Sequence, residues 1–278
     1  MAPPDDAPRL APEIRNHYRA FDEAGRLDAG SGPLEFARTR EIVLRRLPAG
    51  ALDVIDVGGG TGVHAAWLAR NGHRVELVDP VAEHVTRARD EGARPDTGFT
   101  ARLGDARKLP FGDERFDVAL LFGPLYHLPE PADRADALRE AHRVLRPGGI
   151  AFVAAISRFA SLFTGMRKGY LDDPRFFEIV LDDLVTGRHR NTTTDPEYFT
   201  TAFFHTPDLL AAEVEAAGLR AEAPIAVEGP AWALAGFAER WNDDAWRRCY
   251  LTRLRDIETE RCIVEASAHV LAIGTKPG

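Results

Sequence analysis

Cysteine is scarce in this sequence and occurs only at Cys249 and Cys262. Both lie in one stretch with a helical pattern, and a continuous helix would hold them ~20 Å apart at 1.5 Å per residue. No disulfide can span that distance. The sequence also has no CxxC pair and no His/Cys cluster, so we expect no metal site and a cytoplasmic location.

Long hydrophobic runs and an excess of positive charge are absent as well. No apolar run approaches the ~20 residues of a membrane span, and residues 1–12, rich in Pro, Ala and Asp, lack the apolar core of an export signal. We expect these residues to form a disordered tail. The formal net charge is -8, whereas nucleic-acid binders usually carry a basic face. The sequence therefore favours a protein whose partners are neither membranes nor nucleic acids.

What the sequence does contain is a regular alternation of short apolar strands with helical patterns. Short joints with Gly and Pro separate them, which predicts an α/β fold with a doubly wound parallel sheet. The predicted strands are 52–57, 74–79, 99–103, 116–122, 149–156, 219–228 and 268–275. The predicted helices are 34–47, 62–71, 81–91, 132–145 and 207–217.

Two segments interrupt this alternation. Residues 157–206 mix aromatic residues with charged and turn residues, and residues 231–262 form a second helical insertion with three tryptophans. The core domain then comprises 34–156 and 207–278, preceded by an N-terminal lid helix within 13–33. Aromatic insertions suit a cap over an apolar small molecule, which we favour for 157–206. They suit the interface of a homodimer equally well.

Residues 54–62, with the sequence Val-Ile-Asp-Val-Gly-Gly-Gly-Thr-Gly, are typical of a nucleotide-binding corner between a strand and a helix. Glycines let a ligand approach the backbone, and the following helix offers free N–H groups to it. Read from Gly60 to Ala65, the segment matches the dinucleotide fingerprint, which favours NAD. Read from Asp56, it gives D-x-G-x-G-x-G. The corner alone leaves the choice of cofactor open.

A second acid, Asp79, ends the predicted strand 74–79 and is followed by Pro80. In a doubly wound nucleotide site, a carboxylate at this position accepts hydrogen bonds from both hydroxyls of the adenosine ribose. The alternative is a cap for the helix 81–91. One side chain can serve both purposes.

Three further motifs follow in order along the chain. They are Gly104-Asp105-Ala106, then Leu109-Pro110-Phe111 before the strand that begins with Phe116-Asp117, and Leu145-Arg146-Pro147-Gly148-Gly149 before the fifth strand. Together with the D-x-G-x-G-x-G corner, this set resembles the class I S-adenosylmethionine (SAM)-dependent methyltransferases. NAD-linked dehydrogenases have no reason to carry it. The resemblance covers about residues 53–152.

The resemblance implies a seven-stranded sheet whose last strand is antiparallel, with SAM as cofactor and S-adenosylhomocysteine (SAH) as product. It assigns Asp56 and the glycines to the methionine end of SAM, Asp79 to the ribose and Asp105 to the adenine. Tyr18 in the lid helix is expected to close over the cofactor, and Arg38 or Arg40 could pair with its carboxylate. The full set of expected cofactor contacts is Tyr18, Asp56, Gly58, Gly60, Gly62, Asp79, Pro80, Asp105, Ala106 and Phe122.

Candidates for catalysis and for acceptor binding follow the fourth strand and lie in the first insertion. His127 is the leading general base, because its loop lies at the sheet edge where such folds bind ligands; the resemblance also supports it. His205 is the second candidate. Tyr126, Tyr170 and Phe204 are expected to contact the acceptor. For each histidine a purely structural role is the alternative.

The sequence thus predicts a methyltransferase that acts on a small organic acceptor in specialised metabolism. The two alternatives are an NAD(P)-dependent oxidoreductase and a non-catalytic SAM-binding regulatory protein. Neither the acceptor nor the atom that receives the methyl group can be identified from these residues.

Overall fold

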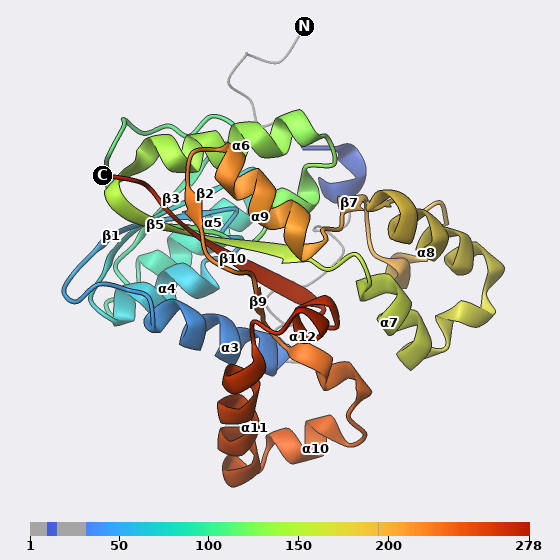
Figure 1. Ribbon diagram of the computed structural model, residues 1–278. Helices are drawn as coiled ribbons and strands as arrows, with labels where there is room; N and C mark the ends of the chain where they lie inside the picture. The colour runs from blue at the N-terminus through green and yellow to red at the C-terminus, as the bar shows by residue number, and fades with distance from the viewer. Residues whose placement is uncertain (1–9, 16–31, 194) are drawn as a thin grey trace, which may run out of the picture.

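The centre of the molecule is a mostly parallel β-sheet (Figure 1). The computed structural model describes residues 10–15, 32–193 and 195–278, so the expected tail over 1–9 and Tyr18 lie outside the described residues. Within the described residues the strand order is β3-β2-β1-β4-β5-β10-β8, and β9 also pairs with β10. The strands are β1 (Asp53–Val57), β2 (Arg74–Asp79), β3 (Thr100–Leu103), β4 (Phe116–Leu121), β5 (Leu145–Ile156), β8 (Arg220–Ala221), β9 (Ile225–Ala226) and β10 (His269–Thr275).

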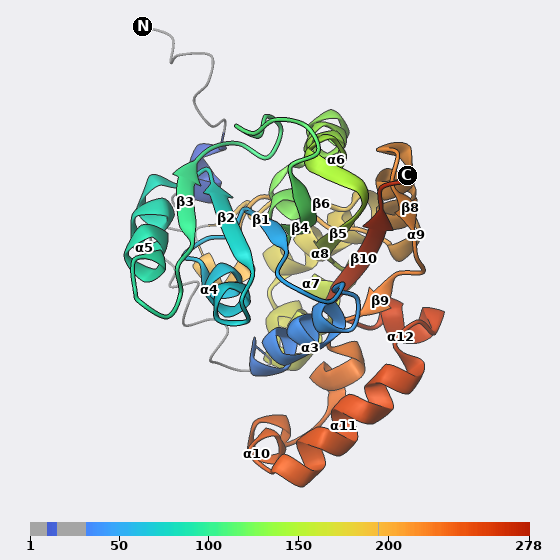
Figure 2. The ribbon, with the colours of Figure 1, turned by 90° about the vertical axis from the view of Figure 1, so that its left-hand side faces the viewer.

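The predicted sheet topology is confirmed. Strands β1 to β5 are parallel to their neighbours, and β10 runs antiparallel to β5, with His269 opposite Ile156. The carboxyl ends of the parallel strands therefore meet at one edge, and β10 starts at that same edge. Figure 2 views the sheet from a second side, with β3 and β10 on opposite flanks of β1 and β4.

Helices cover both faces of the sheet because the central strands β1 and β4 are apolar and buried on both faces. On one face, α3 (Gly32–Leu44), α4 (Val63–Arg70) and α5 (Ala82–Gly92) pack around Leu77 and Leu120. On the other face, α6 (Pro131–Val144) and α9 (Pro207–Ala216) pack around Leu121 and Val153. These are the helices that the alternating pattern predicted, with ends shifted by up to three residues.

Two joints differ from the prediction. The segment Leu145–Gly149 was expected to be a turn before the fifth strand, but β5 already begins at Leu145 and pairs there with Phe116. The register shifts before Val118, so an irregularity within the strand accommodates the Pro and Gly residues. The expected strand 219–228 is present as two short pieces, β8 and β9, that both pair with β10.

The first insertion, 157–206, contains mostly short elements and is drawn beyond the end of β5 in Figure 1. Phe176, Ile179, Val180 and Tyr198 form a small hydrophobic core of their own there. Its elements are α7 (Ala160–Lys168), η2 (Tyr170–Asp172), α8 (Pro174–Thr186), β6 (Arg188–His189), η3 (Pro196–Tyr198) and β7 (Ala202–Phe203). Its expected role as a cap stays a prediction.

The second insertion is helical but broken. Because α11 ends at Ile257 and α12 starts at Arg261, the two cysteines lie on different helices rather than on one continuous helix; both are free and exposed. The Phe163 ring stacks on Trp232 with centroids 4.3 Å apart, which connects the two insertions. The elements are η4 (Gly229–Ala233), α10 (Phe237–Trp241), α11 (Asp244–Ile257) and α12 (Arg261–Glu265).

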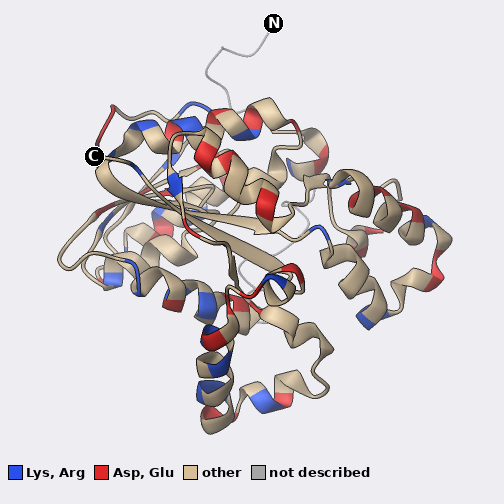
Figure 3. Ribbon diagram, viewed as in Figure 1, with Lys and Arg blue, Asp and Glu red and all other residues tan. Residues whose placement is uncertain are grey.

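Charges of both signs share the surface helices. In Figure 3, α11 at the bottom carries both basic and acidic residues, and α6 at the top does as well. Among the described residues, no helix combines the length and the apolar character that a membrane crossing requires.

Candidate active site

A cavity opens at the carboxyl ends of β1, β2 and β4. It lies where the strand order reverses between β1 and β4, the position at which open α/β sheets bind ligands. It holds about 1380 Å³ of empty space, its open mouth included. Its position makes this cavity the candidate site for a ligand.

Most of the residues expected from the sequence are brought together here. The structure puts the two predicted acids, the first glycines of the corner and the loop after β4 around one space. The expected residues that line the cavity are Asp56, Gly58, Gly60, Asp79, Pro80, Asp105, Ala106, Phe122, Tyr126 and His127.

The glycine corner between β1 and α4 forms one wall. Gly60 has a φ of +57°, and a Cβ atom added to it would meet nothing within 4 Å, so its backbone faces open space. Gly58, with a φ of +69°, has Pro124 packed 2.9 Å from where its Cβ would be. A side chain at Gly58 would displace the loop after β4. Here glycine is required both for conformation and for close packing.

Asp79 fastens this corner to the end of β2. Its side chain is 4% exposed, its Oδ2 accepts a hydrogen bond from the Gly60 N–H at 2.9 Å, and its Oδ1 accepts from the Val81 N–H at 2.9 Å. His84 Nδ1 lies 3.2 Å from Oδ1. The carboxylate therefore orients the loop and the start of α5 while it remains part of the cavity wall.

Asp56 is a buried acid at the end of β1. It is 1% exposed, and burial, followed by the nearby charge of Asp79, raises its pKa to about 7. Its Oδ2 has no hydrogen-bond partner among the described residues. Buried polar atoms are normally paired, so this oxygen marks a place where a ligand's donor or cation would be stabilised.

Asp105 follows β3 and is held by Arg107, which the sequence reasoning did not single out. The Arg107 guanidinium donates to both carboxylate oxygens, at 2.9 and 2.6 Å, and its Nη1 lies 3.0 Å from Asp133 Oδ2. The hydrogen bonds from Arg107 to Asp105 are the main reason that the pKa of Arg107 lies above its ordinary value. Arg107 also lines the cavity. The position of the Asp105 carboxylate is thus fixed by a two-point ion pair.

The loop after β4 continues into η1 (Pro124–His127), and its two candidate residues differ in role. The Tyr126 hydroxyl donates to the Phe122 carbonyl at 2.6 Å, which fixes the loop. The Tyr126 and His127 rings pack edge to face with centroids 4.7 Å apart, and the Phe199 ring lies 6.2 Å from His127. His127 therefore faces the cavity in an aromatic setting, while Tyr126 serves mainly as its support.

A second part of the cavity was missed by the sequence reasoning. Its residues come from α3, β5, the segment after β9, and β10, which are far apart in the chain. The antiparallel pairing of β10 with β5 and β9 brings the residues of these strands together, so no local sequence motif indicates this part of the cavity. These lining residues are Glu35, Thr39, Ala154, Val227, His269 and Leu271.

Several expected residues lie outside the cavity lining, and for these the structure corrects the sequence expectation. Gly62 starts α4, and its missing Cβ faces Phe99 instead. His205 is 1% exposed because its backbone N–H bonds to the Ile156 carbonyl and its ring Nε2 lies 3.1 Å from Glu213. Burial lowers the pKa of His205. A ring enclosed in this way cannot reach an acceptor in the cavity.

The two insertion aromatics also pack elsewhere. Tyr170 packs against Phe176 and Tyr198 within the insertion core. Phe204 is 3% exposed and stacks on His189.

The two guanidinium candidates in α3 lie outside the lining as well. Arg38 is fully buried and bonds to Glu258 at 2.6 Å. Arg40 lies over the Phe36 and Trp67 rings.

Comparisons with known proteins agree with this geometry. Residues 55–153 match the family model described as "Methyltransferase domain". The chain is 30% identical over 227 residues to a ubiquinone biosynthesis O-methyltransferase of Methylobacterium sp. (strain 4-46), covering 78% of this chain and 83% of that protein. It is 36% identical over 165 residues to methyltransferase GfsG of Streptomyces halstedii, covering 56% of this chain and 53% of GfsG. The chain thus spans about half the length of GfsG.

A solved structure shares the fold. The crystal structure of a SAM-dependent methyltransferase from Methanosarcina mazei superposes with a TM-score of 0.59 at 17% sequence identity. The match covers 84% of this chain and 97% of that one. At this identity the likeness concerns the fold alone.

Proposed function

The chain belongs to the class I SAM-dependent methyltransferases, and from this premise we propose that it methylates a small organic acceptor in specialised metabolism. A small acceptor is supported by the apolar residues that line the cavity together with the acids, among them Val227 and Leu271. The name of one relative, an O-methyltransferase of ubiquinone biosynthesis, supports a small organic acceptor. A cytoplasmic location, a cap formed by 157–206 and a homodimer remain predictions.

The single observation that carries the proposal is the meeting of Asp56, Asp79, Asp105 and the glycine corner around one cavity. The residues fit SAM chemically. The unpaired Oδ2 of Asp56 suits the ammonium group of the methionine end, and Gly60 leaves space for a ligand against the backbone. Asp79 would hold the ribose, and Asp105, fixed by Arg107, would face the adenine. No comparable reason supports NAD, and the family assignment removes that alternative.

The chemistry asks little of the protein beyond positioning. Bound SAM supplies an activated methyl group on a sulfonium sulfur. The protein's residues then need to orient the acceptor, exclude water and accept a proton where the acceptor carries one. His127 lies between the Tyr126 and Phe199 rings. It is the residue that the sequence predicts as the base that accepts this proton.

Calorimetric titration of the protein with SAM, SAH and NADH tests the cofactor. We expect binding of SAM and SAH but not of NADH, and a lack of SAM binding at millimolar concentration would contradict the proposal. Mass spectrometry of a metabolite library incubated with the protein and methyl-labelled SAM then tests the reaction. A labelled small-molecule product is expected. SAM binding without any labelled product would instead favour the non-catalytic regulatory protein.

A further inference from the structure

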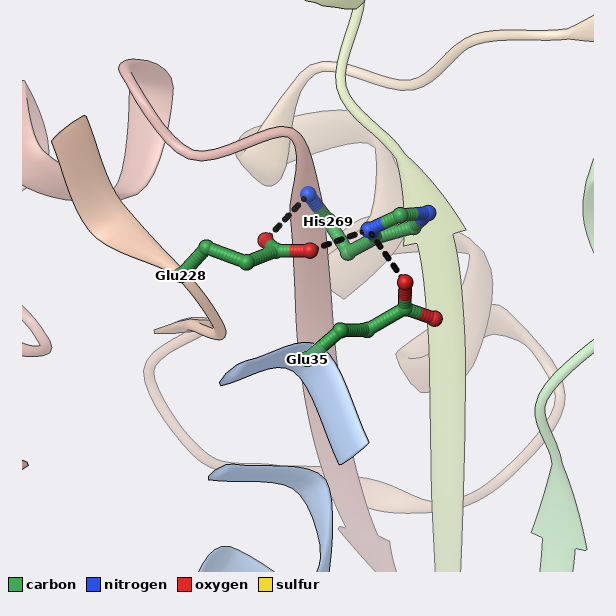
Figure 4. A group of neighbouring side chains, drawn as sticks. All are labelled: Glu35, Glu228 and His269. Carbon is green, nitrogen blue, oxygen red and sulfur yellow. Dashed lines mark hydrogen bonds and ion pairs between the residues drawn. The ribbon is translucent and has the colours of Figure 1, made fainter. Parts of the chain in front are cut away.

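Three polar side chains from distant parts of the chain meet at one end of the cavity (Figure 4). Glu35 lies in the first turn of α3, Glu228 directly precedes η4, and His269 is the first residue of β10. Glu228 is 3% exposed, while Glu35 and His269 line the cavity. No motif in the sequence pointed to this cluster.

Glu228 is held rigidly. Its Oε2 accepts hydrogen bonds from the His269 N–H at 2.9 Å and from the Ser267 hydroxyl at 3.1 Å. Ser267 Oγ in turn accepts the N–H groups of Glu228 and Gly229, both at 3.0 Å. Because the backbone and Ser267 fix one carboxylate oxygen, the other oxygen can point in only one direction.

That other oxygen, Oε1, lies 2.5 Å from His269 Nδ1. Glu35 Oε2 lies 3.7 Å from the same nitrogen. A carboxylate at hydrogen-bond distance keeps the proton on Nδ1, so Nε2 is the ring nitrogen that can accept one. In Figure 4, Nε2 lies on the side of the ring away from both carboxylates.

The same three side chains could be considered for a metal ion, but the distances favour a shared proton. Ligand atoms lie about 2.0–2.2 Å from Zn²⁺. Nδ1 and Oε1 lie at hydrogen-bond distance from each other, which is the arrangement of a donor and its acceptor rather than of two ligands of one tetrahedral ion. The second Glu228 oxygen already accepts two hydrogen bonds. The pair therefore resembles the acid–histidine half of a catalytic triad.

We propose that His269 is the general base of the methyl transfer, that Glu228 positions it, and that the acceptor carries a hydroxyl group. This inference rests on the proposed function. His269 Nε2 takes the hydroxyl proton while the acceptor oxygen forms its bond to the methyl carbon. The bond from that carbon to sulfur breaks, and its electron pair stays on sulfur. The products are the methyl ether, SAH and a proton on His269, which Glu228 stabilises.

The surroundings of His269 suit a hydroxyl-bearing acceptor. Val227, Leu271 and Ala154 line the same part of the cavity, so the cluster has apolar neighbours there. A hydroxyl group in such surroundings reacts poorly with a methyl donor unless a base removes its proton. His127 also lines the cavity, on η1. The two histidines are thus distinct candidates that variants can separate.

The first test compares variants of His269, Glu228 and His127 with wild type, using the acceptor that the library screen identifies. For His269→Gln we expect kcat to fall about 10²- to 10⁴-fold, with the Kd for SAM within twofold of wild type. For Glu228→Gln we expect a loss of more than tenfold, partly rescued by Glu228→Asp. Asp136→Asn, at an exposed position on α6, is the control and should leave kcat within twofold of wild type. If His269→Gln retains a third or more of kcat while His127→Ala does not, His127 is the base and the proposal is wrong.

The second test needs no turnover. In the protein labelled with ¹⁵N-histidine, NMR spectra at alkaline pH should show His269 with its proton on Nδ1, and Glu228→Gln should shift this signal. A proton on Nε2 in the wild-type protein would overturn the proposal, as would stoichiometric binding of Zn²⁺ that His269→Gln abolishes. The labelled-SAM screen adds a third criterion, since methylation at oxygen supports the inference and methylation only at nitrogen or carbon contradicts it. Absence of SAM binding would instead contradict the proposed function, whatever the NMR result.

Discussion

The backbone N–H of Gly60 donates a hydrogen bond to the Oδ2 atom of Asp79 across 2.9 Å. The glycine corner after β1 and the acid at the end of β2 are therefore one unit, and the second carboxylate oxygen extends this unit to Val81 before α5. A change at Asp79 must alter the shape of the loop, in addition to the contact with the cofactor that we propose for this carboxylate.

Asp79→Asn should weaken SAM binding roughly 10- to 150-fold, because hydrogen bonds to a charged group contribute about 1.5–3 kcal/mol each. Calorimetric titration with SAM measures the effect. Asp136→Asn is the control, because Asp136 is exposed on α6 and bonds only to its neighbour Arg139. If Asp79→Asn binds SAM within twofold of wild type, the assigned role of Asp79 is wrong.

Gly60→Ala and Gly50→Ala separate backbone strain from contact with the ligand. Both glycines have positive φ, +57° and +100°, and an added Cβ would meet nothing within 4 Å at either. Both variants should therefore lose stability, on the order of 1–2 kcal/mol, as urea unfolding would measure. Only Gly60 lines the cavity, so only Gly60→Ala should also weaken SAM binding more than tenfold. Equal SAM affinities in the two variants would show that no ligand approaches Gly60.

The sheet, and the meeting of Asp56 and Asp79 at one cavity, could be predicted because their signals are local. Asp56 and Asp79 each follow a run of buried strand residues, and parallel strands bring such ends to one edge. The acceptor end could not be predicted, because Glu228 and His269 are 41 positions apart and meet only through the β9 and β10 pairing. His205 was misjudged for a related reason. Its backbone bonds to Ile156 at the end of β5 and encloses the ring.

The first insertion contains a buried polar network whose loss tests the expected cap. Asp183 is fully buried, accepts from the Ser161 hydroxyl at 2.5 Å, and lies 2.9 Å from His189 Nδ1. Asp183→Ala removes the partner of the buried Ser161 hydroxyl and of His189 Nδ1, which should cost about 1–3 kcal/mol each. If 157–206 is a cap, this variant should raise the KM for the acceptor while the Kd for SAM stays constant. Asp182→Ala, at the exposed neighbouring position, is the control. An unchanged KM in a folded but destabilised variant would contradict the cap.

Asp56 predicts how stability depends on pH. Its pKa is about 7 in the folded protein, against an ordinary value of 3.8, because the carboxyl group is buried and then because Asp79 is near. The folded state thus holds this proton more tightly than the unfolded state, so the associated stability is complete below pH 3.8 and is lost as the pH rises to about 7.

The Asp56→Asn variant tests this pH dependence, because its asparagine side chain has no proton to release in this pH range. Relative to wild type, the unfolding free energy of this variant should rise by about 4 kcal/mol between pH 4 and pH 8, as urea unfolding at several pH values would measure. Asp136→Asn should show no such trend, and parallel curves for Asp56→Asn and wild type would contradict the raised pKa. The pH dependence of SAM binding should have the opposite sign, because the ammonium group of SAM favours the ionised carboxylate of Asp56. We therefore expect wild type, but not Asp56→Asn, to bind SAM more tightly as the pH rises through 7.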